Sequence, residues 1–201
     1  MNDSSANKKS SLPAQNTPKK RKKVSLSYLE NAGLYYLERF SASESQFRRV
    51  MARKIDKSCR DHPEQPKEDC MGMLESVIVK FRELGYLNDS VYAKSLLYTL
   101  QQKGFSRTRI LLTLKSKGLS SVTTEPLGES MPDSHDRYAA IRFMQRKRLG
   151  PFSSRPRDNA AQRDLASMAR AGFSYDVAQS ALSLSVAEAE QVLAEWSYTT
   201  D

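Results

Sequence analysis

The sequence predicts an all-α protein, built as an elongated array of three tandem three-helix repeats behind a disordered basic N-terminal arm. Apolar residues recur at helical spacing through most of the chain, and one helix pattern occurs three times. Glycine adopts the left-handed conformation at little cost, so a glycine just past such a segment indicates a helix end. Glycines 85, 104 and 118 divide residues 81–120 into helices in this way.

The first repeat is expected over residues 25–87, behind an arm at residues 1–24 that has almost no apolar side chains. Ser43 and Gln46 have the spacing of a capping box, which marks a helix start. Two prolines place residues 61–69 in a loop. The expected helices cover residues 26–40, 43–60 and 73–84.

The second repeat is expected over residues 88–132 and the third over residues 133–184, before a C-terminal helix and tail at 185–201. One element is weakly indicated: the segment after Ser120 could hold one short helix before Pro126 and then a loop. The other helices are expected over residues 88–103, 106–117, 134–149, 159–172, 174–184 and 185–196.

Three segments carry the internal repeat, and each would be the middle helix of its unit. All three have a polar or small start and an apolar pair one turn apart, and the last two end in a Gly–apolar–Ser stop. A three-helix unit of about fifty residues has a marginal core, so stacked neighbours would help to bury it. The segments are residues 41–56, 106–120 and 160–174.

The charge of the chain favours a polyanionic partner. Lys and Arg number 32 against 23 Asp and Glu, for a net charge of +9. Residues 1–24 hold seven Lys or Arg and one Asp, whereas residues 185–201 hold four acidic residues and no basic one. Binding to phosphates would therefore be salt-dependent.

No run of eighteen apolar residues occurs, so no membrane-spanning helix is expected. The N-terminus lacks the apolar stretch of a secretory signal. Two cysteines, Cys59 and Cys70, fit a reduced compartment better than a disulfide framework. We therefore expect a cytoplasmic protein, and a monomer.

The sequence shows no catalytic arrangement, so we expect neither an enzyme nor a cofactor. Its two histidines, His62 and His135, lie far apart, and no nucleophile-elbow, P-loop or dinucleotide motif occurs. Cys59, His62 and Cys70 offer three zinc ligands at most, whereas structural zinc sites have four. The thiols are expected to face solvent beside a loop; a metal-dependent enzyme built on this cluster is the alternative, tested by elemental analysis.

A resemblance to a known family joins these observations. GYLND at residues 85–89 and KGFSRTRI at 103–110, with a further KGL, resemble the heart of the RecX family, bacterial regulators of the RecA recombinase. Residues 36–54 resemble its opening segment. RKRLGPF at 146–152 and residues 163–179 resemble the closing unit of one branch. The similarity covers most of residues 26–184, with TTEPLGESMPD departing from the fuller helix that the family often keeps.

The resemblance implies a protein that binds the RecA–DNA filament and restrains recombinase activity in recombination, DNA repair and the SOS response. The curved helical body would lie along the filament groove, blocking extension or favouring disassembly. Residues 18–24, PKKRKKV, match a nuclear-import signal in form. The resemblance implies a bacterial chain, in which nuclear import has no meaning, and so favours an arm that touches DNA phosphates, with a solvated tail as the plainer interpretation.

The expected binding residues are cations on helix surfaces, where Arg and Lys can bridge phosphates or pair with acidic side chains of a partner. Ile110, Leu111 and Leu114 set the buried side of one helix, so other positions face outward. Tyr138, Ile141, Gln145 and Leu149 share one side of another. The expected residues are Lys103, Arg107, Arg109, Lys115, Lys117, Arg142, Arg146, Lys147 and Arg148. The alternative function is a stand-alone DNA-binding protein with helix-turn-helix-like units.

Overall fold

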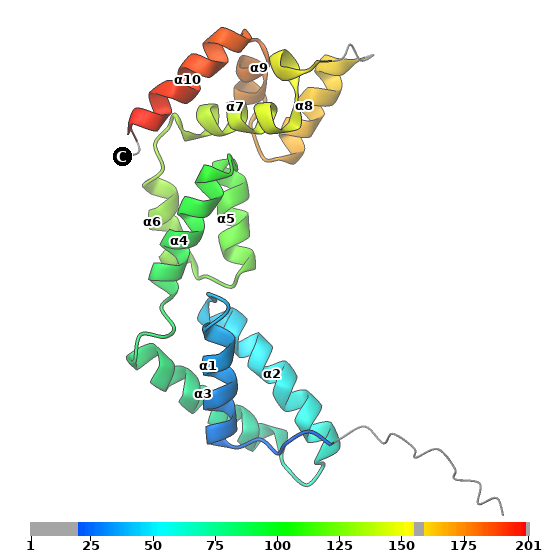
Figure 1. The fold of residues 1–201 in the computed structure, drawn as a ribbon, viewed down its shortest axis with the longest axis vertical. Helices are drawn as coiled ribbons and strands as arrows, with labels where there is room; N and C mark the ends of the chain where they lie inside the picture. Colours follow the sequence, from blue (N-terminus) through cyan, green and yellow to red (C-terminus); the bar gives the residue numbers. More distant parts are fainter. Residues whose placement is uncertain (1–19, 155–158, 200–201) are drawn as a thin grey trace, which may run out of the picture.

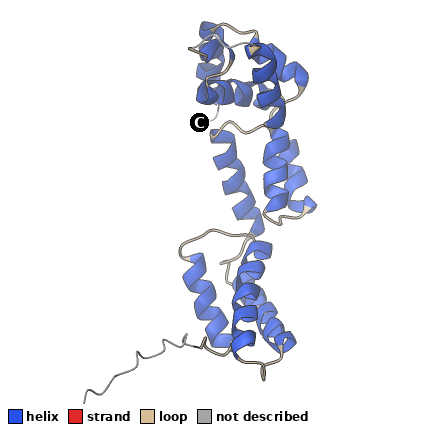
Figure 2. Ribbon diagram, turned by 90° about the vertical axis from the view of Figure 1, so that its right-hand side faces the viewer, coloured by secondary structure: helices blue, strands red, loops and turns tan. Residues whose placement is uncertain are grey.

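The computed structural model describes residues 20–154 and 159–199, and within them all regular structure is helical. The helices form clusters that follow one another in chain order along a single long axis (Figures 1 and 2). The predicted class, an elongated all-α protein, is therefore confirmed. The arm predicted at residues 1–24 lies outside the described residues except for its last five.

The helices form three groups, each with its own cluster of buried side chains. The first helix group contains α1 (Leu26–Leu37), α2 (Glu44–Asp61) and α3 (Lys67–Glu83). The second helix group contains α4 (Asp89–Gln102), α5 (Arg107–Ser116) and α6 (Ser121–Glu129). The third helix group contains α7 (His135–Lys147), a 3-10 turn (Gly150–Phe152), α8 (Ala160–Arg170), α9 (Tyr175–Leu182) and α10 (Val186–Thr199).

The predicted helix starts and stops have a visible cause. Ser43, Ser106 and Ser174 each accept a hydrogen bond from the backbone N–H three residues later, which satisfies a donor that the first turn leaves free. Gln46 does not complete the expected capping box, because its Oε1 accepts no hydrogen bond within the described residues, while its Nε2 donates to the hydroxyl of Tyr36 at 3.3 Å. The glycines that follow helices with positive φ are Gly85, Gly104, Gly118 and Gly172.

The core of the first helix group is aromatic. Phe47 and Phe81 are fully buried, with ring centroids 5.7 Å apart. Gly33 lies in the middle of α1, where glycine is about 1 kcal/mol less favourable than alanine. A Cβ there would lie 2.8 Å from the Phe81 ring and 2.9 Å from the Phe47 ring, so the rings occupy the space that a side chain would need.

The loop of the first helix group is shorter than the sequence indicates. The helix predicted at residues 73–84 begins at Lys67, so the loop expected at 61–69 spans only 62–66. Pro66 occupies the N-cap position, where its missing N–H costs nothing. Glu68 and Asp69 lie in the first turn, where negative charge is favourable.

Residues 20–24 pack against this loop, although they were predicted as part of the disordered arm. Val24 is buried. The side-chain amide of Gln65 accepts from the backbone N–H of Val24 at 3.0 Å and donates to the backbone carbonyl of Val24 at 2.6 Å. The hydroxyl of Ser58 donates to the carbonyl of Lys22 at 2.7 Å. Main-chain hydrogen bonds of this kind give the segment a defined position that its composition does not reveal.

In the second helix group, α6 continues through Pro126, so the loop predicted after that proline is wrong. Proline removes one helical hydrogen bond, which frees the carbonyl of Val122. Val122 is 82% exposed, so water can satisfy that carbonyl. The opposite side of α6 packs inward, with Thr124 buried and Gly128 against Leu111 of α5.

The third helix group includes α10, which was predicted to lie outside the third repeat. Ala189 of α10 is fully buried in the cluster that α7 and α9 contribute to. The capping box at its start is confirmed, since Ser185 Oγ accepts from the N–H of Glu188 and the Glu188 carboxylate accepts from the N–H of Ser185. Of the residues predicted to share one side of α7, Tyr138, Ile141 and Leu149 are buried, but Gln145 is exposed and Phe143 is buried as well.

The first junction, between the first and second helix groups, joins helix ends by hydrogen bonds. The hydroxyl of Ser43, at the start of α2, donates to the carbonyl of Lys117, at the end of α5. The N–H of Glu44 donates to Oδ1 of Asp89, the first residue of α4, at 2.8 Å.

The second junction, between the second and third helix groups, repeats this arrangement. The hydroxyl of Ser106, at the start of α5, donates to the carbonyl of Ala171, at the end of α8, at 2.8 Å. The N–H of Arg107 donates to Oδ1 of Asp136, in the first turn of α7, at 2.6 Å. Helices α8, α5 and α2 therefore meet end to end, with their dipoles in the favourable head-to-tail order. Because similar positions make similar bonds at both junctions, we propose that α1–α3, α4–α6 and α7–α9 correspond to the three predicted repeats, with α10 packed onto the third.

Replacing Ser106 by alanine is expected to cost about 1–2 kcal/mol in the free energy of unfolding, because one hydroxyl caps α5 and also bonds the next group. The matched control is Ser174→Ala, since Ser174 caps α9 but has no junction partner in the described chain. Urea denaturation should show the larger loss for Ser106→Ala. Equal losses would mean that the junction bond adds nothing.

Candidate partner-binding pocket

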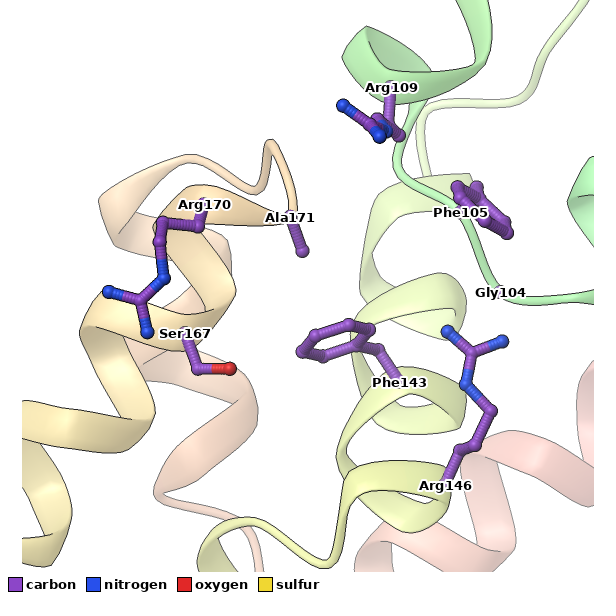
Figure 3. Close-up of a pocket in the computed structure, with 8 residues that line it drawn as sticks. All are labelled: Gly104, Phe105, Arg109, Phe143, Arg146, Ser167, Arg170 and Ala171. Atoms are coloured by element: carbon purple, nitrogen blue, oxygen red, sulfur yellow. The ribbon is translucent and has the colours of Figure 1, made fainter. Parts of the chain in front are cut away.

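A pocket of about 310 Å³ lies at the second junction, where α7, α8 and the start of α5 meet. It combines arginines with aromatic rings, and Figure 3 shows Phe143 between Ser167 of α8 and Arg146 of α7. The lining residues are Gly104, Phe105, Arg109, Phe143, Arg146, Ser167, Arg170 and Ala171.

Arg146 is held in place by its surroundings. Its guanidinium carbon lies 5.8 Å from the ring centroids of both Phe105 and Phe143, within the range of a cation–π interaction. Its Nη1 donates to the carbonyl of Lys103 at 2.6 Å, at the C-terminal end of α4. A cation is favourable at that end of a helix, so the side chain is oriented before any ligand arrives.

Arg109 and Arg170 approach the pocket from α5 and α8 and are both exposed. Within residues 20–154 and 159–195, neither guanidinium has a hydrogen bond or an ion pair to the protein. Their charges are therefore not neutralised by neighbouring carboxylates. A planar guanidinium binds carboxylate or phosphate oxygens in a fork, so this pair can bind an acidic group.

A second hollow, of about 320 Å³, continues the basic surface along α7. It is lined by Gln102, Lys103, Arg142, Gln145 and Arg146, so Arg146 borders both cavities. Arg142 lies 5.9 Å from the ring centroid of Tyr138, and its Nη2 is 3.4 Å from the carbonyl of Gln102.

The structure therefore brings together four of the predicted cations, namely Lys103, Arg109, Arg142 and Arg146. Lys115 and Lys117 lie near the other end of α5; Lys117 is about 12 Å along the helix axis from Arg109. The carbonyl of Lys117 belongs to the first junction. The sequence gives this spacing along the helix, but it does not show which end of α5 meets α8, and so it could not separate these lysines from the pocket.

Arg107, a predicted binding residue, has protein partners of its own. Its Nη2 donates to the carbonyls of Met131 (2.7 Å) and Pro132 (3.1 Å) and lies 3.7 Å from a carboxylate oxygen of Asp133. It thereby ties the start of α5 to the loop before α7. Lys147 and Arg148 are exposed at the end of α7, outside the pocket lining.

The sequence did not indicate Arg170 or the two phenylalanines as site residues. Arg170 lies in the basic last turn of the third repeated segment, just before the Gly172 stop. This position is the one feature of the sequence that could have indicated Arg170 as a binding residue. Phe105 is the apolar residue after the Gly104 stop, in the loop between α4 and α5, and Phe143 is an apolar residue of α7. Apolar residues at such positions usually pack in the core, so the sequence cannot distinguish these two from ordinary core residues.

His135 is a buried titratable group that contacts the loop carrying Phe105. It is fully buried, and its Nε2 lies 3.0 Å from the carbonyl of Phe105. Burial lowers the pKa of its imidazole below the usual value, and the backbone hydrogen bond only partly opposes this. A neutral imidazole therefore supports the loop that carries Phe105.

The prediction that both thiols face solvent is wrong for Cys70, which is fully buried. His62 uses its Nε2 to bond the carbonyl of Arg21 at 2.7 Å. In the part of the chain that the structure describes, no three His, Cys, Asp or Glu side chains are grouped to hold a metal ion, and no helix is long and apolar enough to cross a membrane.

Three proteins of known name are similar to this chain, although no family model matches it. Regulatory protein RecX of Myxococcus xanthus is 36% identical over 165 residues, which cover 81% of this chain and 88% of that protein. Regulatory protein RecX of Agrobacterium fabrum is 26% identical over 172 residues, which cover 85% and 90%.

The crystal structure of RecX from Lactobacillus salivarius matches with a TM-score of 0.54 and 20% identity, over 84% of this chain and 96% of that one. At that identity it supports the helical fold alone. The Myxococcus relative carries the assignment, because both chains are matched over most of their length. This chain belongs to the RecX family of regulatory proteins.

Proposed function

We propose that the protein inhibits the RecA recombinase by binding the RecA–DNA filament, and so regulates recombination, DNA repair and the SOS response. The observation that carries the proposal is the pocket at the second junction, where Arg109 and Arg170 present unneutralised charge on a RecX-family chain. The protein acts by occupying a surface and needs no catalytic group.

The shape of the molecule suits a partner that repeats along one direction. Three helix groups lie along one axis (Figure 1), so contacts can be spread over several filament subunits. Contacts that are weak one by one then act together, because once one group is bound the others bind at a high effective concentration. Basic side chains would steer the protein to phosphates or acidic side chains.

The pocket can hold an acidic group from either component of the filament. Arg109 and Arg170 supply exposed forks, and Arg146 supplies a third that the phenylalanine rings orient. Carboxylates and phosphates both accept two parallel hydrogen bonds from a guanidinium. A body bound across neighbouring subunits would oppose their rearrangement, which explains inhibition in physical terms.

Reversing both exposed charges should weaken this regulation. With Arg109→Glu/Arg170→Glu, we expect at least about tenfold more protein to be needed for half-inhibition of the recombinase ATPase on single-stranded DNA, because charge-assisted hydrogen bonds contribute about 1.5–3 kcal/mol each. The measurement is a titration of ATP hydrolysis at fixed, low ionic strength.

The matched control is Arg53→Glu/Lys57→Glu on α2, which reverses two exposed cations of the first helix group. It changes the net charge by the same amount, so it measures only the non-specific electrostatic attraction between the protein and the filament. Equal weakening in both variants would reject the pocket, and a wild-type protein without effect at stoichiometric excess would reject the function. A mobility shift with specific duplex DNA, competitor DNA and no recombinase tests the alternative, a stand-alone DNA-binding protein.

A further inference from the structure

Two cysteines face each other inside the first helix group. Sγ of Cys59, on α2, lies 3.9 Å from Sγ of Cys70, on α3, and both residues are free thiols. They lie on neighbouring helices joined by the loop at residues 62–66. Forming a disulfide would require the sulfur atoms to approach to about 2.0 Å, a short movement for two helices joined by so short a loop.

The two thiols have different access to solvent. Cys59 is half-buried, whereas Cys70 is fully buried. Burial raises the pKa of the Cys70 thiol to about 11, so at neutral pH it remains protonated. Because the thiolate is the reactive form and must be reached by the oxidant, Cys59 is the sulfur that a small oxidant attacks first.

The surroundings of the pair keep the helices in register. Lys67, at the start of α3, forms a 2.7 Å ion pair with Asp56, one turn before Cys59 on α2. The structure thus holds the two sulfur atoms within hydrogen-bonding distance but without a covalent bond between them. In a reducing compartment a pair of this kind is more typical of a transient, reversible disulfide than of a permanent one.

We propose that Cys59 and Cys70 form a reversible intramolecular disulfide when the protein meets hydrogen peroxide. The Cys59 thiolate attacks one peroxide oxygen and breaks the O–O bond, which leaves a sulfenic acid and releases hydroxide. The Cys70 sulfur then attacks the Cys59 sulfur, the S–O bond breaks, and the departing hydroxide takes the Cys70 proton as water. Overall, two thiols lose two electrons and two protons, and one peroxide becomes two waters.

The disulfide would close the end of the first helix group where residues 20–24 are bound. Ser58, beside Cys59, bonds the carbonyl of Lys22, and Gln65 lies within the closed loop. Oxidation would therefore fix the site at which the N-terminal segment attaches. This site lies in a different helix group from the arginine pocket, so the inference does not rest on the proposed function.

The experiment oxidises the full-length protein with a few equivalents of hydrogen peroxide and measures intact mass and thiol alkylation. We expect a loss of about 2 Da and of both alkylatable thiols, with a Cys59–Cys70 peptide that dithiothreitol separates. Cys70→Ala, which buries no new polar group, should stop at a sulfenic acid on Cys59 that dimedone traps. Cys59→Ser should keep its remaining thiol under the same treatment.

Three results would contradict the proposal. A wild-type chain that gains oxygen on Cys59 without losing 2 Da would show that the two sulfur atoms do not meet. A disulfide between two chains, seen as a dimer on a non-reducing gel, would show that pairing is intermolecular. Equal peroxide sensitivity of Cys59→Ser and wild type would reject Cys59 as the first sulfur attacked.

Discussion

Replacing Phe47 by alanine should lower the free energy of unfolding of the first helix group by about 3–5 kcal/mol. The ring is fully buried, 5.7 Å from that of Phe81, and it fills the space that Gly33 leaves against α1. The second and third helix groups should keep the protection of their backbone amides against hydrogen exchange, because the buried clusters within the described residues share no side chain. Hydrogen exchange resolved by mass spectrometry measures this segment by segment.

Phe40→Ala is the matched control, since Phe40 is 57% exposed and its loss should change stability by no more than about 0.5 kcal/mol. If Phe47→Ala removed protection from all three groups together, the chain would be one cooperative unit and the junctions would transmit stability. Loss confined to α1, α2 and α3 supports a chain of separately cored groups.

Gly172→Ala should have the second large effect, a loss of about 2–5 kcal/mol. Gly172 has φ +89°, which an alanine adopts only with strain, and a Cβ there would lie 2.7 Å from the hydroxyl oxygen of Ser106. That hydroxyl holds the carbonyl of Ala171 across the second junction, so the substitution separates α5 from α8. Urea denaturation measures the loss.

The same variant should also weaken the effect on recombinase ATPase, because Arg109 and Arg170 approach the pocket from the two sides of this junction. Gly72→Ala is the control: nothing lies within 4 Å of its Cβ on α3, so it should stabilise the chain by about 0.5–1 kcal/mol. A Gly172→Ala protein as stable as wild type would show that the junction tolerates a side chain there.

Most of the helical fold could be predicted because its signals are local. The hydroxyls of Ser43, Ser106 and Ser174 cap helices within four residues of sequence, and the glycine stops need only their own φ. The wrong predictions also came from local signals, which tertiary packing overruled. Pro126 suggests a break, but α6 continues because its other side packs on α5.

The candidate site was predicted only in part. Periodicity placed Arg109 on the outer side of its helix, and the structure confirms that it is exposed. Arg107 follows the same local rules, yet its guanidinium bonds carbonyls more than twenty residues away. Arg170 joins Arg109 only because the end of α8 abuts the start of α5. No pattern within one helix contains that contact.

The sequence by itself determined the helical class, the helix ends marked by serine caps and glycine stops, and the family, since each depends on residues a few positions apart or on direct similarity. Tertiary structure alone decided which charges share a pocket, which thiols meet and which helix ends abut. Those features join residues far apart in the chain, as with Ser106 and Ala171. Their proximity depends on how whole helices pack, and helical periodicity carries no information about that.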